Sequence, residues 1–410
     1  MNTDRLLDRF LRYVRIDTTA REGADGYPSS PGQLDLGRML VKELRELGLT
    51  DAEQDDHGIV MATVPASEKV DAPAIAWSAH LDTSPETTGA NVRPQVIRGY
   101  DGRDLVLPGD PSRVLRPAED ADLARLVGKT IITTDGTTLL GADDKAGVAV
   151  IMEAAAYLVE HREIVHGPLR ICFTCDEEIG RGVDHVDLKK LGAVACYTLD
   201  GAGADEIDVE TFSADLAVVT VRGVNIHPSI AKGKMVNAVR AGAAFVDRLP
   251  RGRLAPESAD GREGFLHPYH VEGQVAGLTM RILLRDFETA ALESQAALLR
   301  ETAAAVMADF PGSAIEVDIR PQYRNMRESL ALQPRVVANA EQALRRLRRE
   351  PKRSIIRGGT DGSRFSALGL PTPNLSTGEH NPHSPLEWTC LEELTLAAES
   401  LVSLSQVWAL

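Results

Sequence analysis

The sequence has few cysteines, a deficit of basic residues and no apolar stretch long enough to cross a membrane. Four Cys in 410 residues do not make a disulfide framework. The most apolar run, residues 146–159, contains Glu153 and is too short to span a bilayer. Because 45 Lys and Arg face 60 Asp and Glu, the net charge is −15, which disfavours nucleic-acid and anionic-membrane partners. The first 17 residues are studded with charges, so we expect no signal peptide and a cytoplasmic protein.

Three short motifs that carry chemistry in other proteins do not support a function here. Cys172 and Cys175 form a C-x-x-C pair on a predicted strand, where the odd spacing sends the two side chains to opposite faces. The run 201–203 begins like a dinucleotide-binding loop, but Glu206 stands where the third glycine belongs. The chain has no G-x-S-x-G motif, which excludes the usual serine-hydrolase elbow.

The spacing of apolar residues predicts an α/β domain. Apolar runs at 59–64, 74–77, 169–174 and 193–199 predict strands, and helical periodicity predicts helices at 6–14, 34–47 and 144–159. This alternation favours a mixed, mainly parallel sheet with helices on both faces. Between 84 and 127 Pro, Gly and Asp multiply, which predicts an irregular excursion with a hairpin.

From about residue 211 the pattern changes. The order becomes strand 216–221, helix 236–248, strands 270–275 and 278–287, helix 292–307 and strand 314–319. This β-α-β-β-α-β order is that of a ferredoxin-like α+β unit, so we expect an inserted domain at 211–322. The first domain then comprises 1–210 and 323–410, and it closes with a helix at 336–349, a short strand at 372–375 and a helix at 391–404.

Histidines and acids stand where the predicted strands end. They are His80 and Asp82, Glu177 and Glu178, and Asp200. In an extended H-x-D, Asp82 can hold one imidazole nitrogen of His80 while the other binds a metal. Asp143 begins the helix at 144–159, where an acid is also ordinary because the free N–H groups favour negative charge. Since parallel strands end at one edge of a sheet, we expect these residues to meet there.

Such a cluster needs compensation for its charge. Two bare carboxylates about 4 Å apart repel each other by roughly 4 kcal/mol at an effective dielectric constant of about 20. Several such pairs would approach the whole stability of a domain, about 5–15 kcal/mol. Either some acids are protonated or cations sit among them. Histidine and carboxylate ligands without thiolates favour zinc, and the number of acids suggests two ions that share a carboxylate.

The ordered motifs resemble a known family. H-x-D at 80–82, G-A-D-D-K-A-G at 141–147, D-E-E-I-G at 176–180, Y-T-L-D-G at 197–201 and a late His resemble the M20 co-catalytic zinc metallopeptidases. Further resembling stretches lie at 9–13, 131–136, 231–238, 284–287 and 357–362, so the resemblance runs nearly end to end. Within the family, the resemblance is greatest to the aminopeptidases that act on tripeptides. It implies a zinc exopeptidase-like catalytic domain and a lid or dimerisation domain at 211–322.

The resemblance also implies a role for each matching residue. It implies two Zn²⁺ ions per chain, with Asp143 as the bridging carboxylate. The remaining metal ligands are His80 and Asp200 for one ion, and Glu178 and His383 for the other. The catalytic residues are Asp82, which orients His80, Glu177 as general base, and His227, which approaches the scissile carbonyl oxygen. The substrate-binding residues are Asn237, Arg285 and Arg357, of which the two arginines receive the C-terminal carboxylate.

The implied activity is release of the N-terminal residue from tripeptides by metal-activated water. The expected partners are small peptides and a second copy of the chain bound through the lid domain. Two departures from the family pattern matter: His380 is a rival to His383 as ligand, and Ser229 follows His227-Pro228 where Gly is commoner. Two other functions stay open. One is another M20 hydrolase, such as a dipeptidase, carboxypeptidase or N-acyl amino acid deacylase, and the other is a non-catalytic metal-binding module.

Overall fold

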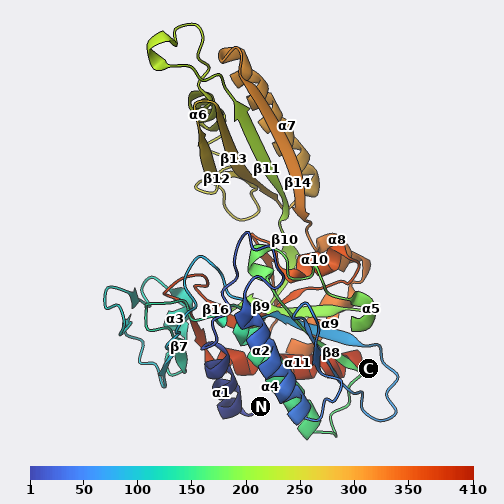
Figure 1. Ribbon diagram of the computed structural model, residues 1–410. Coiled ribbons are helices and arrows are strands. Elements are labelled where there is room, and N and C mark those ends of the chain that lie inside the picture. The colour runs from blue at the N-terminus through green and yellow to red at the C-terminus, as the bar shows by residue number, and fades with distance from the viewer. The chain divides into compact units, whose positions relative to one another are not determined.

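The structure is a computed structural model that describes residues 1–410. The contacts between residues divide the chain into two compact units. Unit 1 comprises Met1–Val209, Met326–Ile355 and Thr360–Leu410, and unit 2 comprises Glu210–Asn325 and Ile356–Gly359. Figure 1 shows a large sheet with helices in unit 1 and a smaller sheet with two long helices in unit 2. No helix combines the length and the apolar character needed to cross a membrane.

Unit 1 is built on an 11-stranded sheet. Its main path runs, edge to edge, through β1 (Glu53–Gln54), β2 (Val60–Val64), β8 (Leu169–Thr174), β3 (Ile75–His80), β9 (Cys196–Ala202), β16 (Asn374–His380), β17 (Trp388–Cys390), β7 (Ile131–Thr133) and β4 (Gln95–Ile97). Beside this path, β10 (Glu206–Thr211) pairs with β16 and with β15 (Lys352–Ile356). The predicted excursion contains a hairpin of β5 (Leu105–Val106) and β6 (Val114–Leu115).

Parallel pairing is confined to the centre of this sheet. Strands β8, β3, β9 and β16 are parallel to one another, whereas β2 pairs antiparallel with β8 and β17 pairs antiparallel with β16. The short loop 381–387 explains one antiparallel pair, because so few residues can join β16 to β17 as a hairpin but cannot form a crossover. The predicted mixed α/β sheet is confirmed, with fewer parallel strands than the apolar alternation suggested.

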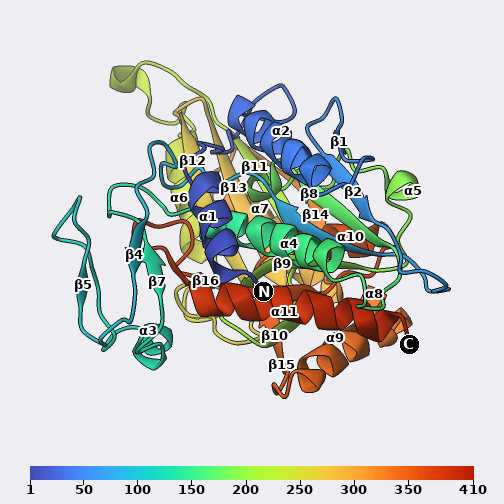
Figure 2. The same ribbon diagram turned by 90° about the horizontal axis from the view of Figure 1, so that it is seen from below.

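Helices cover both faces of the sheet. One face packs against α1 (Thr3–Tyr13), α2 (Pro31–Glu46), α4 (Ala142–Glu160), α9 (Arg335–Arg346) and α11 (Leu391–Trp408). The other face packs against α5 (Leu188–Leu191) and α10 (Asp361–Ala367). The short helix α8 (Arg327–Leu332) adds Leu330 to the core of the first face, and α3 (Ala121–Arg125) packs in a separate small cluster. Figure 2 shows α4 and α11 side by side across the sheet. Cys175 and Cys172 join the apolar clusters on opposite faces, and all four thiols are free and buried.

Helix α4 is buried around almost its whole circumference, which explains its composition of Ala, Val and Gly. It lies between the sheet and the helices α1 and α11. A Cβ at Gly147 would lie 1.9 Å from the carbonyl oxygen of Leu199 in β9, so only glycine allows this approach. The contact brings the first turn of α4 against the strand that carries Asp200.

Unit 2 holds the strands β11 (Ser213–Arg222), β12 (Phe265–Gln274), β13 (Gly277–Asp286) and β14 (Ala314–Tyr323), and the helices α6 (Ala238–Arg248) and α7 (Thr289–Asp309). The strands pair antiparallel in the order β12-β13-β11-β14, and their apolar face packs on both helices. Strand β12 begins at Phe265, earlier than the predicted 270. The missed part contains Pro268, which has no N–H for the ladder, and the register of the pairing shifts between Pro268 and His270. The segment Ile356–Gly359 also joins unit 2, where the N–H of Phe212 donates to the carbonyls of Ile356 and Gly358.

Helix α1 is held to α4 by a buried ion pair, which gives a stability prediction. Glu153 has no exposed surface, and its carboxylate accepts hydrogen bonds from Arg9 at 2.9 Å and from Arg5 at 2.7 Å. Glu153→Gln leaves the buried Arg9 guanidinium poorly compensated, so we expect unit 1 to lose about 3 kcal/mol of unfolding free energy. Urea titration monitored by tryptophan fluorescence measures this unfolding free energy, because Trp77, Trp388 and Trp408 all lie in unit 1.

Glu160→Gln is the matched control. Glu160 contacts the same Arg5, but its side chain is 46% exposed, so we expect a loss of less than about 1 kcal/mol. Equal losses in the two variants would contradict the view that the buried pair holds α1 in place.

Candidate metal centre

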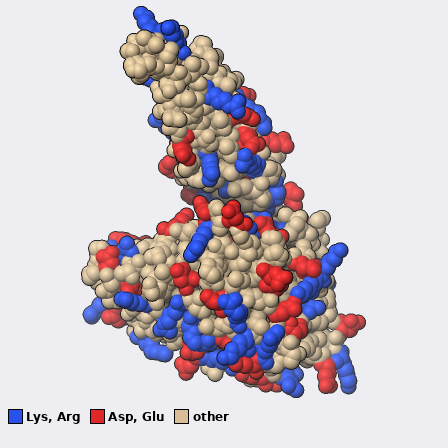
Figure 3. Space-filling view, in the orientation of Figure 1, with Lys and Arg blue, Asp and Glu red and all other residues tan.

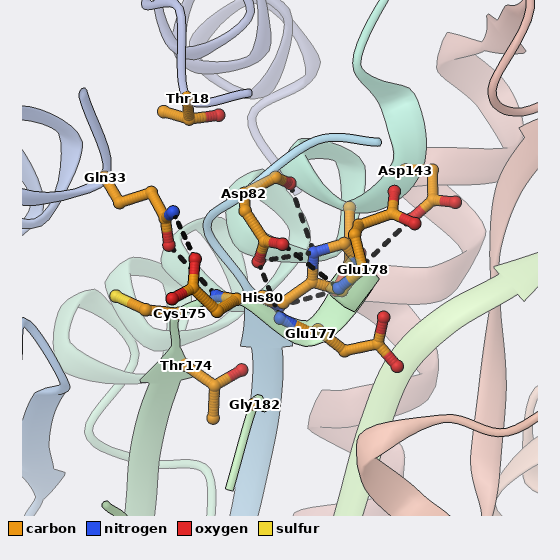
Figure 4. A network of polar contacts seen from close by, with 12 residues as sticks. Thr18, Gln33, His80, Asp82, Asp143, Thr174, Cys175, Glu177, Glu178 and Gly182 are labelled. Atoms are coloured by element: carbon orange, nitrogen blue, oxygen red, sulfur yellow. Dashed lines mark hydrogen bonds and ion pairs between the residues drawn. The ribbon is translucent and has the colours of Figure 1, made fainter. Parts of the chain in front are cut away.

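The side chains of the candidate site come from strand ends and from two loops of unit 1. His80 ends β3, and Asp200 lies in β9 near its end. Glu177 and Glu178 form the 3₁₀ turn Glu177–Ile179 that follows β8. Asp143 lies in the first turn of α4, with non-helical backbone angles that carry its carboxylate out of the helical path. His383 comes from the β16–β17 loop, so the expected edge of the sheet collects all these residues, several of which Figure 4 shows.

The carboxylate of Asp143 lies between two groups of potential ligands. One group is His80, Asp143 and Asp200, and the other is Asp143, Glu178 and His383; within each group the ligand atoms lie within 4.8 Å of one another. A third group of acids, Asp144, Asp200 and Glu379, is as close together but does not contain Asp143 or a histidine. Asp143 Oδ1 is 2.9 Å from His80 Nε2, and Asp143 Oδ2 is 3.2 Å from His383 Nε2. Glu178 Oε2 lies 3.0 Å from His383 Nε2, and Asp200 Oδ1 lies 3.7 Å from His80 Nε2. Each oxygen of Asp143 therefore faces a different group.

Asp82 connects His80 to the turn that carries both glutamates. Its carboxylate lies 3.4 Å from His80 Nδ1, on the side of the ring opposite Asp143. The same carboxylate accepts the N–H groups of Glu177 and Glu178, each at 3.0 Å. Figure 4 shows the carboxylate of Glu177 pointing away from Asp82. His80 Nδ1 also lies 3.1 Å from the main-chain carbonyl of Asp82. Asp82 thus fixes the ring of His80 through its carbonyl and its carboxylate, and the same buried carboxylate fixes the main chain of the turn.

The two adjacent acids at the start of α4 have different surroundings. Asp144 accepts the N–H of Gly147 at 3.1 Å, which is the ordinary capping contact of an acid at a helix start. Its other oxygen accepts the N–H of His80 at 2.9 Å, so Asp144 also fastens β3 to α4. Asp143 makes no such contact and turns to the two histidines instead.

The charges of the cluster are strongly coupled. Although burial alone lowers the pKa of His80, the carboxylates of Asp143 and Asp200 raise it well above its usual range. Burial opposes the charge of His383 too, but Asp143 and Glu178 raise the pKa of His383 to about 11. Burial and the charge of Asp143 raise the pKa of Glu178 to about 8 and that of Asp200 to about 7. In metal-free protein, protons therefore compensate the clustered negative charge.

The remaining two acids of the site shift in opposite directions. Burial works to raise the pKa of Asp143, but its contacts with His383 and His80 lower it below the usual range. Burial raises the pKa of Glu177 well above its usual range.

The acidic side chains on the surface of unit 1 are in a different situation. On the face that Figure 3 shows, they are interspersed with Lys and Arg, and water and these opposite charges screen them.

These residues fit a pair of divalent cations. Glu178 Oε1 is buried without a hydrogen-bond partner, and an unpaired buried carboxylate oxygen is costly unless a cation or proton meets it. The donors are imidazole nitrogens and carboxylate oxygens without thiolates, a set that suits zinc. The two groups share one residue, Asp143, as a bridging carboxylate requires.

The structure separates the two candidate histidines: His380 ends β16, and His383 lies in the β16–β17 loop. His380 Nε2 lies 2.8 Å from Glu393 Oε2, and its ring stacks on Trp388 with centroids 3.7 Å apart. His383 is the one that meets Asp143 and Glu178. The left-handed backbone of His383, with φ of 60°, turns its ring toward them while Thr87 Oγ1 donates to its carbonyl at 2.6 Å.

The four candidates predicted outside this cluster belong to unit 2. His227 is exposed, with Nδ1 2.7 Å from Ser229 Oγ, and Asn237 caps α6 by accepting the N–H groups of residues 239 and 240. Arg285 Nη1 donates to the carbonyls of Asp215 and Leu284. Arg357 donates to three carbonyls of the loop 259–263, and its guanidinium lies over the rings of residues 212 and 265.

Sequence reasoning missed two acids, Asp176 and Glu387, that fix the main chain next to the candidate ligands by hydrogen bonds. Asp176 accepts the N–H of Ser29 and the amide of Gln33, each at 2.7 Å, while its own N–H donates to Gln33 Oε1 at 3.0 Å. This anchors the residue before Glu177 to the start of α2. Glu387 accepts three N–H groups around Asp143. The run of acids at 176–178 could have indicated Asp176, but no spacing in the sequence could have linked Glu387 to Asp143.

Comparisons with known proteins identify the family. A sequence profile described as Peptidase family M20/M25/M40 matches residues 134–406. The peptidase T of Geobacillus thermodenitrificans (strain NG80-2) is 44% identical over 403 residues, and that of Bacillus subtilis (strain 168) is 42% identical over 403 residues, with 98% of each chain covered in both cases. The structure of aminopeptidase PepT from Bacillus cereus ATCC 10987 matches 100% of both chains at 25% identity, with a TM-score of 0.77. The chain therefore belongs to peptidase family M20/M25/M40, which confirms the resemblance inferred from its motifs.

Proposed function

We propose that this chain is a dizinc aminopeptidase that releases the N-terminal residue from tripeptides. One observation carries the proposal: the Asp143 carboxylate faces His80 through one oxygen and His383 through the other, beside the turn that bears Glu177. The relatives named peptidase T support the substrate class, since the similarity covers 98% of both chains. The same metal core would also serve the other M20 reactions. The preference for peptides of one length therefore distinguishes a tripeptide aminopeptidase from these other hydrolases.

We assign the ions to the two ligand groups of the cluster. His80 and Asp200 would hold one ion, Glu178 and His383 would hold the other, and Asp143 would bind both. When bound, zinc polarises a carbonyl oxygen as a Lewis acid and lowers the pKa of water to about 7. Asp82 orients His80 by its position on the opposite side of the imidazole ring.

Glu177 is the proposed general base. Its main chain is fixed by the bond to Asp82, and its carboxylate is outside both ligand groups, so it is free to take up a proton. A Glu177 carboxylate oxygen accepts the proton of the attacking water and then donates it to the nitrogen of the leaving amine. The intact glutamate at this position argues against a non-catalytic metal-binding module.

Unit 2 would supply the remaining contacts to the peptide. Because His227 Nδ1 contacts Ser229, its Nε2 is the atom we propose to donate to the scissile carbonyl oxygen. Arg285 and Arg357 would receive the C-terminal carboxylate, with Asn237 nearby, because guanidinium groups bind carboxylates through two parallel hydrogen bonds. An arginine at a set distance from the ions would measure peptide length. The lid role of residues 211–322, dimerisation through them and a cytoplasmic location stay predictions.

The role of Glu177 is tested by Glu177→Gln. The variant keeps the shape of the side chain but cannot accept a proton, so we expect kcat on a tripeptide to fall by about 10²–10⁴-fold. Inductively coupled plasma mass spectrometry should still find two ions per chain. Glu178→Gln is the matched control, since we expect it to lose an ion. Loss of an ion in Glu177→Gln would mean that this residue is a ligand rather than the base.

The length selection is tested with unmodified di-, tri- and tetrapeptides and with tripeptides amidated at the C-terminus. Amidation removes the charge that the arginines would bind, so we expect kcat/KM to fall by at least about tenfold, the effect of losing about 1.4 kcal/mol of charge-assisted hydrogen bonding. Arg285→Lys should narrow the difference between the free and amidated tripeptide. Equal rates on tetrapeptides, or on amidated tripeptides, would contradict the proposed length measurement.

A further inference from the structure

Glu387 is a buried carboxylate that the proposed reaction does not use. It lies in the β16–β17 loop, four residues after His383, and is 1% exposed. Its Oε2 accepts the N–H groups of Leu140 at 2.7 Å and Gly141 at 2.8 Å. Its Oε1 accepts the N–H of Asp143 at 3.1 Å. One side chain thus collects three main-chain donors from the segment that presents Asp143.

These donors have no helical partners of their own. The first amides of a helix lack acceptors in the preceding turn, and the backbone here is also non-helical at Asp143, with ψ of 103°. Gly141 has φ of +82°, a left-handed conformation that suits glycine, and it turns its N–H toward the same carboxylate as Leu140. The path of residues 140–143, and with it the direction of the Asp143 side chain, depends on an acceptor at this place.

The same residue also constrains His383. The loop 381–387 is short, and it is held at one point by the bond from Thr87 Oγ1 to the carbonyl of His383. Glu387 holds it at a second point, against the start of α4. Two segments more than 230 residues apart in the sequence, each with one ligand of the same group, are therefore joined by these hydrogen bonds.

We propose that Glu387 is a positioning residue for the metal centre. It sets the separation of Asp143 and His383, and so determines the affinity of the ion that these two residues share with Glu178. The ion held by His80, Asp143 and Asp200 depends on it less, because His80 and Asp200 are fixed by β3, by β9 and by the bond from the N–H of His80 to Asp144. This inference rests on the proposed dinuclear centre.

The structure indicates a substitution that removes one contact. In Glu387→Gln, the amide oxygen can take the place of Oε2 and keep the bonds from Leu140 and Gly141. The amide NH₂ then faces the N–H of Asp143, donor against donor, and the contact to the bridging residue is lost. Glu392→Gln is the matched control: Glu392 also accepts a main-chain N–H, that of Thr130 at 2.9 Å, but lies outside both ligand groups.

The experiment is a titration of the metal-free, full-length protein with Zn²⁺ in the presence of a competing chelator of known affinity. We expect two ions for the wild-type chain and for Glu392→Gln. In Glu387→Gln we expect one ion to bind with wild-type affinity and the other at least tenfold more weakly. Co²⁺ substitution gives a second readout, because the absorption bands of one of two cobalt environments should change. A merely structural role would lower the melting temperature of the metal-free protein and leave both affinities unchanged.

The outcomes separate the two proposals. A wild-type chain that binds fewer than two ions contradicts the dinuclear centre itself. Two ions bound with unchanged affinities by Glu387→Gln would overturn the role of Glu387 while leaving the centre intact. If Glu387→Gln does not fold, Glu387→Asp supplies the same comparison, because it keeps the charge but shortens the reach to Asp143, and its second ion should also be weakened.

Discussion

The crowding of like charges at one buried edge of the sheet is the constraint on which the rest of the site depends. Asp143, Glu178 and Asp200 lie within ligand distance of two histidines, largely out of contact with solvent. Unit charges about 4 Å apart interact by roughly 4 kcal/mol at an effective dielectric constant of about 20, so the arrangement persists only with protons or cations among the acids. Divalent cations supply that compensation at neutral pH and leave the acids ionised as ligands.

A second set of carboxylates holds the ligands in place from outside the two groups that contain Asp143. Asp82 accepts N–H groups from the turn that carries Glu178, and Asp144 accepts the N–H of His80. Glu387 does the same for the segment that carries Asp143. All three acids bind main-chain N–H groups, and Asp82 also contacts the ring of His80. Ligand positions are consequently set by the backbone of strands and turns, which moves less than rotatable side chains do, and small errors in ligand position cost metal affinity.

The sequence predicted the gathering of His80, Glu178 and Asp200 because strand ends leave a local signal, an apolar run that stops at an acid or a histidine. It did not reveal Glu387, since a hydrogen bond to residues more than 240 positions away has no spacing that could signal it. Parallel pairing was overestimated for a similar reason: strand β2 is as apolar as its parallel neighbours, and only its connections determine its direction. The edge strand β12 was predicted too short because Pro268 and the register shift beside it interrupt the regular strand pattern.

The most direct test of the central claim is an anomalous difference map from crystals of the zinc-loaded protein, recorded on both sides of the zinc absorption edge. The account predicts two peaks per chain, one beside His80 and Asp200 and the other beside Glu178 and His383. It further predicts that a carboxylate oxygen of Asp143 contacts each of them. A single peak, or two peaks of which one is not in contact with Asp143, would contradict the account.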